Sequence, residues 1–258
     1  MCLGTTAFLL NQVPDNKFLS FVFFATLCSY NLHWYLSTNS QNNGERILWS
    51  QQNRHLQFFL FLIGLIGSIF FGLFLLKFWL WLGFAAFITL LYTSPKMPYA
   101  NLILLKKIAF GKTIYLALVW VYVTCILPIV INASTWDSDF IWFILSRLCL
   151  IYANCILFDL RDKEADINEG IRSLITYLSD KNIMKLFISS VLLFLIFGLM
   201  TIVATDWVYS ATLLFPGVLL AASYRYFRQN LSDFTYYFLL DGLLILSSVL
   251  LLVLKLWY

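Results

Sequence analysis

The sequence has 258 residues, of which 61% are hydrophobic and 12% are charged, and its mean hydropathy is +0.83. Soluble domains carry about 45–50% apolar and about 25% charged residues. The composition therefore excludes an ordinary water-soluble enzyme, a disordered chain and a nucleic-acid-binding domain. Since a spanning helix takes about 20 apolar residues, membrane spans account for nearly the whole chain, which we expect to form a single domain over residues 1–258.

The apolar runs predict an all-α, polytopic membrane helix bundle with eight to nine transmembrane helices. Helices are expected because only helices and closed barrels satisfy every backbone polar group in lipid, and the runs lack the alternating pattern of barrel strands. The predicted spans are the first 20 or so residues of Phe18–Gly44, then Leu56–Leu76, Phe78–Thr93, Thr113–Ile131, Phe140–Phe158, Leu186–Thr205, Trp207–Tyr224 and Phe234–Leu254.

A shorter apolar run, Cys2–Leu10, precedes these eight spans. It is too short to cross a bilayer. Two interpretations remain open: it is the tail of a truncated first helix that begins upstream, or it is a short helix at the membrane interface.

Basic residues divide unequally between the two sets of connections. If the eight spans alternate in direction, one side receives segments 37–55, 94–112, 159–185 and 225–233, which hold 13 of the 17 Lys and Arg residues. The opposite side keeps three, Lys17, Lys77 and Lys255. Cytoplasmic connections carry the excess of basic residues in membrane proteins. We therefore expect an integral, multi-pass protein of a bacterial-type inner (plasma) membrane, with the basic segments in the cytoplasm.

Acidic residues gather in one of these expected cytoplasmic segments. Six of the 13 acids lie between Asp159 and Asp180. Asp159, Asp162 and Asp166 follow the spacing i, i+3, i+7, which places three carboxylates on one face of a helix. Mg²⁺ is commonly bound by one or two carboxylates together with substrate phosphates, so the spacing suits such a site. It also suits an ordinary solvated helix whose basic residues pair with the acids.

The segment 159–175, DLRDKEADINEGIRSLI, resembles the second aspartate motif of the UbiA superfamily of intramembrane prenyltransferases, D-x-R-D-x-x-G-D-x-x-x-G-x-x-T-L-P. It differs from that motif at Ala165, Ser173 and Ile175. The segment 92–120 is similar to the Tyr-Ser-x-Pro stretch, the Leu-Lys-Arg element and the Trp-containing helix of the same family. The matching positions of the motif are Asp159, Arg161, Asp162, Asp166, Gly170 and Leu174.

The first aspartate motif of that family, N-D-x-x-D-x-x-x-D, is degenerate in this chain. Asn31 is kept, but Leu32, Tyr35 and Asn39 occupy the three aspartate positions. One of the two metal sites that the family uses should therefore be lost. His33 stands inside this motif and could accept a proton in altered chemistry, although a packed histidine between helices fits the sequence as well.

The resemblance implies a UbiA-like fold and a divergent prenyltransferase. Such an enzyme moves an isoprenoid chain from a prenyl diphosphate to a lipophilic acceptor at the cytoplasmic side of the membrane. It implies one Mg²⁺ on Asp159, Asp162 and Asp166, with Arg161, Lys106, Lys107 and Lys112 neutralising the diphosphate. The alternatives are a catalytically inactive protein of this fold that binds lipid or acts as a scaffold, and, with less support, a transporter.

One basic residue lies inside a predicted span. Arg147 precedes Asp159 by twelve residues, about 18 Å along a helix. A charge at that depth should face the bundle interior. We expect Asp139 or Asp241 to pair with it, and Asn154 to line a cavity or to bridge two helices.

Overall fold

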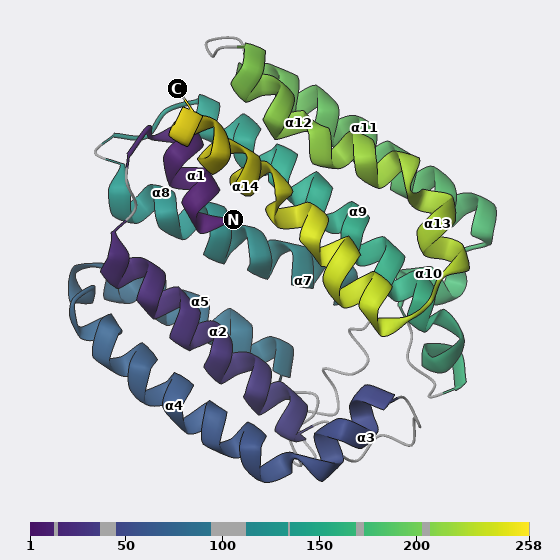
Figure 1. The fold of residues 1–258 in the computed structure, drawn as a ribbon, viewed down its shortest axis with the longest axis horizontal. Helices are drawn as coiled ribbons and strands as arrows, with labels where there is room; N and C mark the ends of the chain where they lie inside the picture. Colours follow the sequence, from purple (N-terminus) through teal and green to yellow (C-terminus); the bar gives the residue numbers. More distant parts are fainter. Residues whose placement is uncertain are drawn as a thin grey trace. The chain divides into compact units, whose positions relative to one another are not determined.

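The computed structural model describes residues 1–12, 15–36, 45–93, 112–133, 135–168, 173–202 and 207–257, and these residues are almost entirely helical, with no strand among them. The all-α prediction is therefore confirmed for the described part of the chain. The α-helices are α1 (Cys2–Leu9), α2 (Asn16–Leu36), α3 (Glu45–Gln52), α4 (Arg54–Leu73), α5 (Trp79–Thr93), α7 (Lys112–Val121), α8 (Leu127–Asn132), α9 (Asp139–Asn168), α10 (Leu174–Tyr177), α11 (Asp180–Ile202), α12 (Trp207–Ala222), α13 (Tyr224–Gln229) and α14 (Asp241–Trp257) (Figure 1).

Two π-helical turns and one 3₁₀ turn complete the described helices. The π-helical turn Tyr122–Ile126 joins α7 to α8, and the π-helical turn Thr235–Leu240 leads into α14. Leu76–Phe78 forms the 3₁₀ turn before α5. A π-helical turn holds one residue more than an α turn and occurs frequently at functional sites.

Five helical segments in the described part of the chain are long and apolar enough to cross a membrane. They are Arg54–Leu73, Thr113–Asn132, Asp139–Glu164, Asp180–Thr201 and Thr235–Leu254. Leu76–Tyr92 and Ser210–Ala222 are shorter apolar helices. The segment predicted as the first span forms α2, which is 21 residues long, but α2 is not one of the five. Its sequence includes Asn16, Lys17, Asn31 and His33, which lower its average hydropathy.

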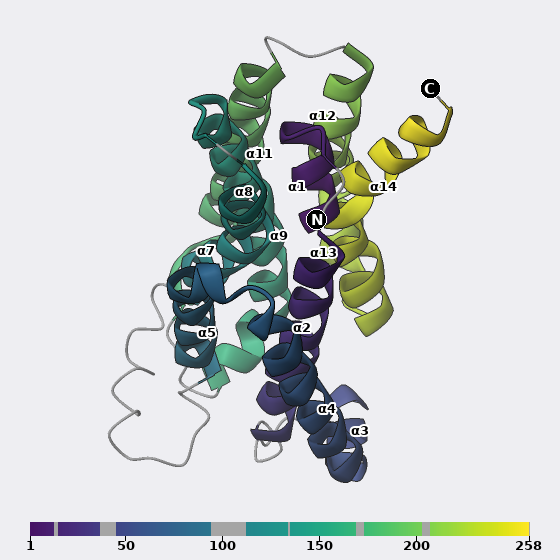
Figure 2. The same ribbon diagram turned by 90° about the vertical axis from the view of Figure 1, so that its left-hand side faces the viewer.

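The chain divides into two compact units, Met1–Val13 with Ala109–Tyr258, and Pro14–Ile108. In the first unit, α9 packs against α7 and α11, and α14 packs against α12 and α1 (Figures 1 and 2). Its core is built from fully buried side chains of several helices, among them Ile156, Leu157, Phe187, Phe194 and Tyr236.

The second unit is organised around the pair α2 and α4. Gly64 of α4 lies against the backbone of α2, since a Cβ at this position would come within 2.4 Å of the Cys28 nitrogen. Gly67, one turn further on, lies against the ring of Phe24. Small residues at helix interfaces let the backbones approach closely, as is common between helices in membranes.

Helix α9 positions the polar residues that the sequence singles out. It is one continuous helix of 30 residues, about 45 Å long at 1.5 Å per residue. This exceeds the hydrocarbon core of a bilayer, which is about 30 Å thick. Residues 159–168 at the carboxyl end of α9 therefore extend beyond the apolar part of the helix.

Candidate functional site

The candidate site lies at the carboxyl end of α9 and includes the three predicted acids. Asp159 and Asp166 are buried, with 8% and 6% of their surfaces exposed. The side chain of Asp162 is 43% exposed. All three lie on one uninterrupted helix, so the helical spacing that the sequence predicted is present.

Asp159 is connected to the start of α7. The Thr113 hydroxyl donates a hydrogen bond to Oδ2 of Asp159, and both residues are buried. Thr113 directly follows Lys112, the first residue of α7. This contact brings the start of α7 next to the acidic end of α9. Lys106 and Lys107 themselves, like Asn39, lie outside the described residues.

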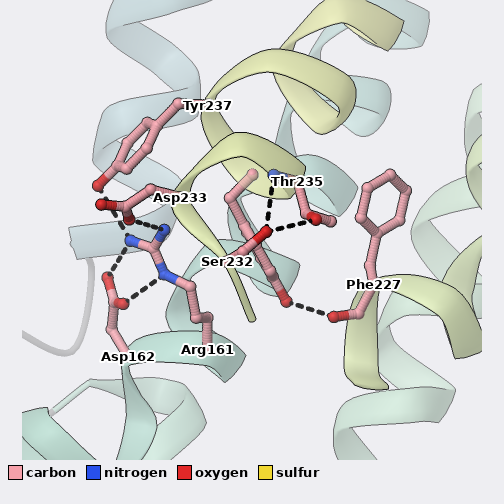
Figure 3. A network of polar contacts seen from close by, with 8 residues as sticks. Arg161, Asp162, Phe227, Ser232, Asp233, Thr235 and Tyr237 are labelled. Carbon is pink, nitrogen blue, oxygen red and sulfur yellow. Dashed lines mark hydrogen bonds and ion pairs between the residues drawn. The ribbon is translucent and has the colours of Figure 1, made fainter. Parts of the chain in front are cut away.

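Asp162 is paired with the adjacent Arg161 (Figure 3). Nε of Arg161 lies 2.7 Å from Oδ1 of Asp162, and Nη2 lies 3.3 Å from Oδ2. This bidentate contact is the favourable geometry for a guanidinium and a carboxylate.

Arg161 also reaches the segment that begins the last helix. Its Nη2 donates to the Tyr237 hydroxyl at 3.0 Å, and its Nη1 lies 3.5 Å from a carboxylate oxygen of Asp233. The guanidinium carbon lies 5.3, 4.8 and 4.9 Å from the ring centroids of Phe158, Tyr236 and Tyr237. Cation–π attraction within about 6 Å stabilises such an arrangement. The guanidinium is thus enclosed by two acids and three rings.

The turn before the last helix is fixed by its own hydrogen bonds. The Thr235 amide donates to Oγ of Ser232 at 3.3 Å, as in a helix N-cap. The Tyr236 hydroxyl donates to the Phe227 carbonyl at 2.9 Å. That carbonyl belongs to the last turn of α13, where backbone acceptors lack helical partners. These contacts hold Asp233, Tyr236 and Tyr237 in position around Arg161.

Sequence reasoning did not single out Asp233, Tyr236, Tyr237 or Thr113. The signal that could have found the first three is the Ser232–Thr235 capping pattern, which predicts a helix beginning next to Asp233. Their proximity to Arg161, more than 70 residues earlier in the chain, required the fold.

The three acids as placed do not form a ready metal centre. Over the described residues, no group of three or more His, Cys, Asp or Glu side chains is close enough to hold a metal ion. The carboxylate oxygens suit Mg²⁺ chemically, but Asp162 is engaged by Arg161 and Asp159 accepts from Thr113. The Mg²⁺ site therefore stays a prediction.

The degenerate first motif belongs to the second compact unit. The Asn31 side chain donates to the Leu27 carbonyl of its own helix at 2.7 Å. The His33 ring stacks on Tyr92 with a centroid separation of 5.5 Å. The Arg54 guanidinium lies 4.5 Å from the Tyr35 ring centroid. His33 is thus packed among aromatic side chains, and its altered chemical role stays a prediction.

Arg147 does not pair with either acid that the sequence suggested. It donates to Oγ of Ser247 at 3.1 Å and to the Leu213 carbonyl at 3.0 Å, so the predicted ion pair with Asp139 or Asp241 is wrong. Asp241 lies six residues before Ser247, about 9 Å away along a helix, and Asp139 is two turns before Arg147 on the same helix. The Asn154 amide donates to the Leu240 carbonyl at 2.9 Å, so it bridges two helices.

The described part of the chain is therefore an all-helical protein whose long apolar helices are consistent with a membrane protein. Comparison of the sequence with protein-family models and with curated proteins, and of the fold with solved structures, finds no match.

Proposed function

We propose that this chain is a multi-pass integral membrane protein that binds a prenyl diphosphate at the carboxyl end of α9. In this proposal it acts as a divergent UbiA-like prenyltransferase and passes the isoprenoid chain to a lipophilic acceptor. The observation that carries the proposal is the pair of buried carboxylates, Asp159 and Asp166, at the polar end of an otherwise apolar 30-residue helix.

Burial of carboxylates at this place favours a binding site over a solvated surface helix. Carboxylates are buried only where polar or charged groups surround them, whereas a helix on a solvated surface would leave its acids exposed. The apolar part of the same helix adjoins this acidic end, at the depth where a hydrocarbon chain would lie. A ligand with a charged head and an apolar tail therefore matches the arrangement.

A specific observation favours a second candidate, a catalytically inactive protein of the same plan that binds isoprenoid lipid or acts as a scaffold. Arg161 is already enclosed by Asp162, Asp233 and three aromatic rings. A phosphate could use this guanidinium only by displacing those acids. The missing acids of the first motif point the same way. Lipid binding without catalytic turnover is therefore the main alternative to the prenyltransferase.

Binding of farnesyl diphosphate to the purified full-length protein, with and without Mg²⁺, tests the proposal. We expect Mg²⁺-dependent binding in the wild type and a loss of at least about tenfold, or 1.4 kcal/mol, in Asp159→Asn and in Asp166→Asn, because each substitution removes a charge at nearly constant shape. Glu164→Gln is the matched control, since Glu164 is exposed on the same helix and should leave binding unchanged.

The outcomes separate the two candidates. Mg²⁺-dependent binding followed by release of diphosphate with a panel of quinone-ring acceptors supports the enzyme. Binding that is indifferent to Mg²⁺ and to both substitutions contradicts the diphosphate site and favours the inactive lipid-binding protein.

A further inference from the structure

The middle of α9 carries an arginine that has no counter-charge among the residues that the structure describes. Arg147 is 4% exposed and lies within the span Asp139–Glu164. None of the described carboxylates forms an ion pair with it. A charge inside a membrane span is costly and is almost always neutralised or turned toward a polar cavity.

The partners that Arg147 does have are neutral. Its Nη1 and Nη2 donate to the Ser247 hydroxyl and the Leu213 carbonyl. The rings of Phe143 and Phe194 lie 5.2 and 5.4 Å from its guanidinium carbon. Its Nε is buried and has no acceptor among the described residues. A guanidinium cannot be deprotonated in proteins, so the described residues compensate neither the positive charge nor the buried Nε–H group.

A small cavity lies beside this guanidinium. Its volume is about 10 Å³, and Arg147, Ser247, Ser248 and Thr5 are among the residues that line it. That volume is about what one water molecule needs, so only a ligand of similar size can enter. The cavity belongs entirely to the first compact unit, because all its lining residues lie in Met1–Val13 or Ala109–Tyr258.

The polar side chains that line the cavity can all donate hydrogen bonds. Ser247 accepts from Arg147, and Ser248 is buried; neither hydroxyl donates to any acceptor that the structure describes. With Nε of Arg147, three donors without an acceptor therefore belong to residues that line one cavity. The Thr5 hydroxyl, by contrast, donates to the Thr124 carbonyl at 2.7 Å.

An excess of donors next to an uncompensated cation selects an anion. A water molecule would accept from two of these donors and could donate to the serine oxygens, but it would leave the charge of Arg147 uncompensated. A monovalent anion accepts from all three and cancels the charge of Arg147. We propose that Arg147, Ser247 and Ser248 form an intramembrane binding site for a small monovalent anion, of which chloride is the common example.

The thermal unfolding midpoint of the purified full-length protein in detergent tests this site. It is measured over a range of chloride concentrations, with gluconate replacing chloride at constant ionic strength. A ligand that binds only the folded state raises the midpoint with the logarithm of its concentration above the Kd. We expect this rise in the wild type with chloride and with bromide, since gluconate is too large for the cavity.

Two substitutions assign the response to the cavity. Arg147→Met should abolish the chloride dependence, because the cation is removed. Ser248→Ala keeps the charge and removes one donor, so it should shift the same curve to roughly tenfold higher chloride. If Arg147→Met does not fold, the chloride dependence of the unfolding midpoint of Ser248→Ala tests the proposal by itself. Arg225→Met is the control, because Arg225 is exposed and does not line the cavity, and it should keep the wild-type curve.

Three results would overturn the proposal. The first is a wild-type midpoint that is the same in chloride and gluconate. The second is a chloride response that Ser248→Ala leaves at the wild-type concentration. The third is a response that Arg225→Met removes, which would place the anion on the surface.

Discussion

Tyr236 joins three parts of the candidate site through one side chain. It is fully buried, its ring lies 4.8 Å from the guanidinium carbon of Arg161, and its hydroxyl donates to the last turn of α13. The ring and the hydroxyl thus have separate roles. The ring faces the Arg161 cation, and the hydroxyl satisfies the Phe227 carbonyl.

Tyr236→Phe separates these roles, because it removes the hydroxyl and keeps the ring. We expect a loss of about 1–1.5 kcal/mol in the free energy of unfolding, the usual effect of one lost hydrogen bond. Denaturant unfolding in detergent measures it. Tyr226→Phe is the control, since Tyr226 is 47% exposed and should change stability little; an equal loss in both variants would contradict this account.

Residue types and spacings along α9 predicted part of this site. The apolar run and the i, i+3, i+7 acids placed Asp159, Asp162 and Asp166 on one helix. The sequence could not show that Asp233 and Tyr237 meet Arg161, because that contact depends on how the last helix packs on α9. For the same reason Ser247, and not an acid, was found at Arg147.

At the scale of helices, α2 and α4 form the closest pair in the second unit. A Cβ on Gly64 would lie 2.4 Å from the nitrogen and 2.8 Å from the Cα of Cys28. These are backbone atoms, so they cannot move aside without separating the two helices. Gly83 of α5, in contrast, has no atom within 4 Å of the position that its Cβ would take.

Gly64→Ala and Gly83→Ala therefore form a matched pair. We expect Gly64→Ala to destabilise the protein by about 1–3 kcal/mol, as overpacking usually does. Gly83→Ala should be neutral or stabilising by up to about 1 kcal/mol, because alanine favours helix more than glycine. Thermal unfolding of both variants checks this, and a milder effect at Gly64 than at Gly83 would refute the close packing.

Apolar runs predicted most helices well and their ends less well. The predicted span Leu186–Thr205 begins six residues after the start of α11 at Asp180, because polar first-turn residues continue the helix beyond its apolar part. The expected total of eight to nine spans stays a prediction, since the described residues contain five helices that qualify by length and composition. The expected single domain likewise remains untested.

At the scale of the whole molecule, the distribution of basic residues predicts the orientation in the membrane. Residues 135–138 and 230–234 lie at opposite ends of α9, because the first group precedes Asp139 and the second contains Asp233, which contacts Arg161 near the other end. The end near Arg161 also carries Lys163, Arg225 and Arg228. By the positive-inside rule it should face the cytoplasm.

Single cysteines in a background without native cysteines test this orientation. Thr135→Cys and Gln229→Cys both fall at exposed positions. In intact cells a membrane-impermeant maleimide should label Thr135→Cys alone, and Gln229→Cys should react only after the membrane is permeabilised. The reverse pattern would show that the acidic end of α9 is outside the cell.

The π-helical turn Thr235–Leu240 has a consequence for how this sequence could change. Because it holds one residue more than an α turn, the helix on either side of it is offset by about 100°. Tyr236 and Tyr237 approach Arg161 from within this turn, and Ser247 approaches Arg147 from beyond it. Deletion of one residue here would restore a regular helix but rotate one set away from its arginine. The contacts of both arginines of α9 can therefore be kept together only with this inserted residue. We expect the segment to tolerate substitutions better than a change in its length.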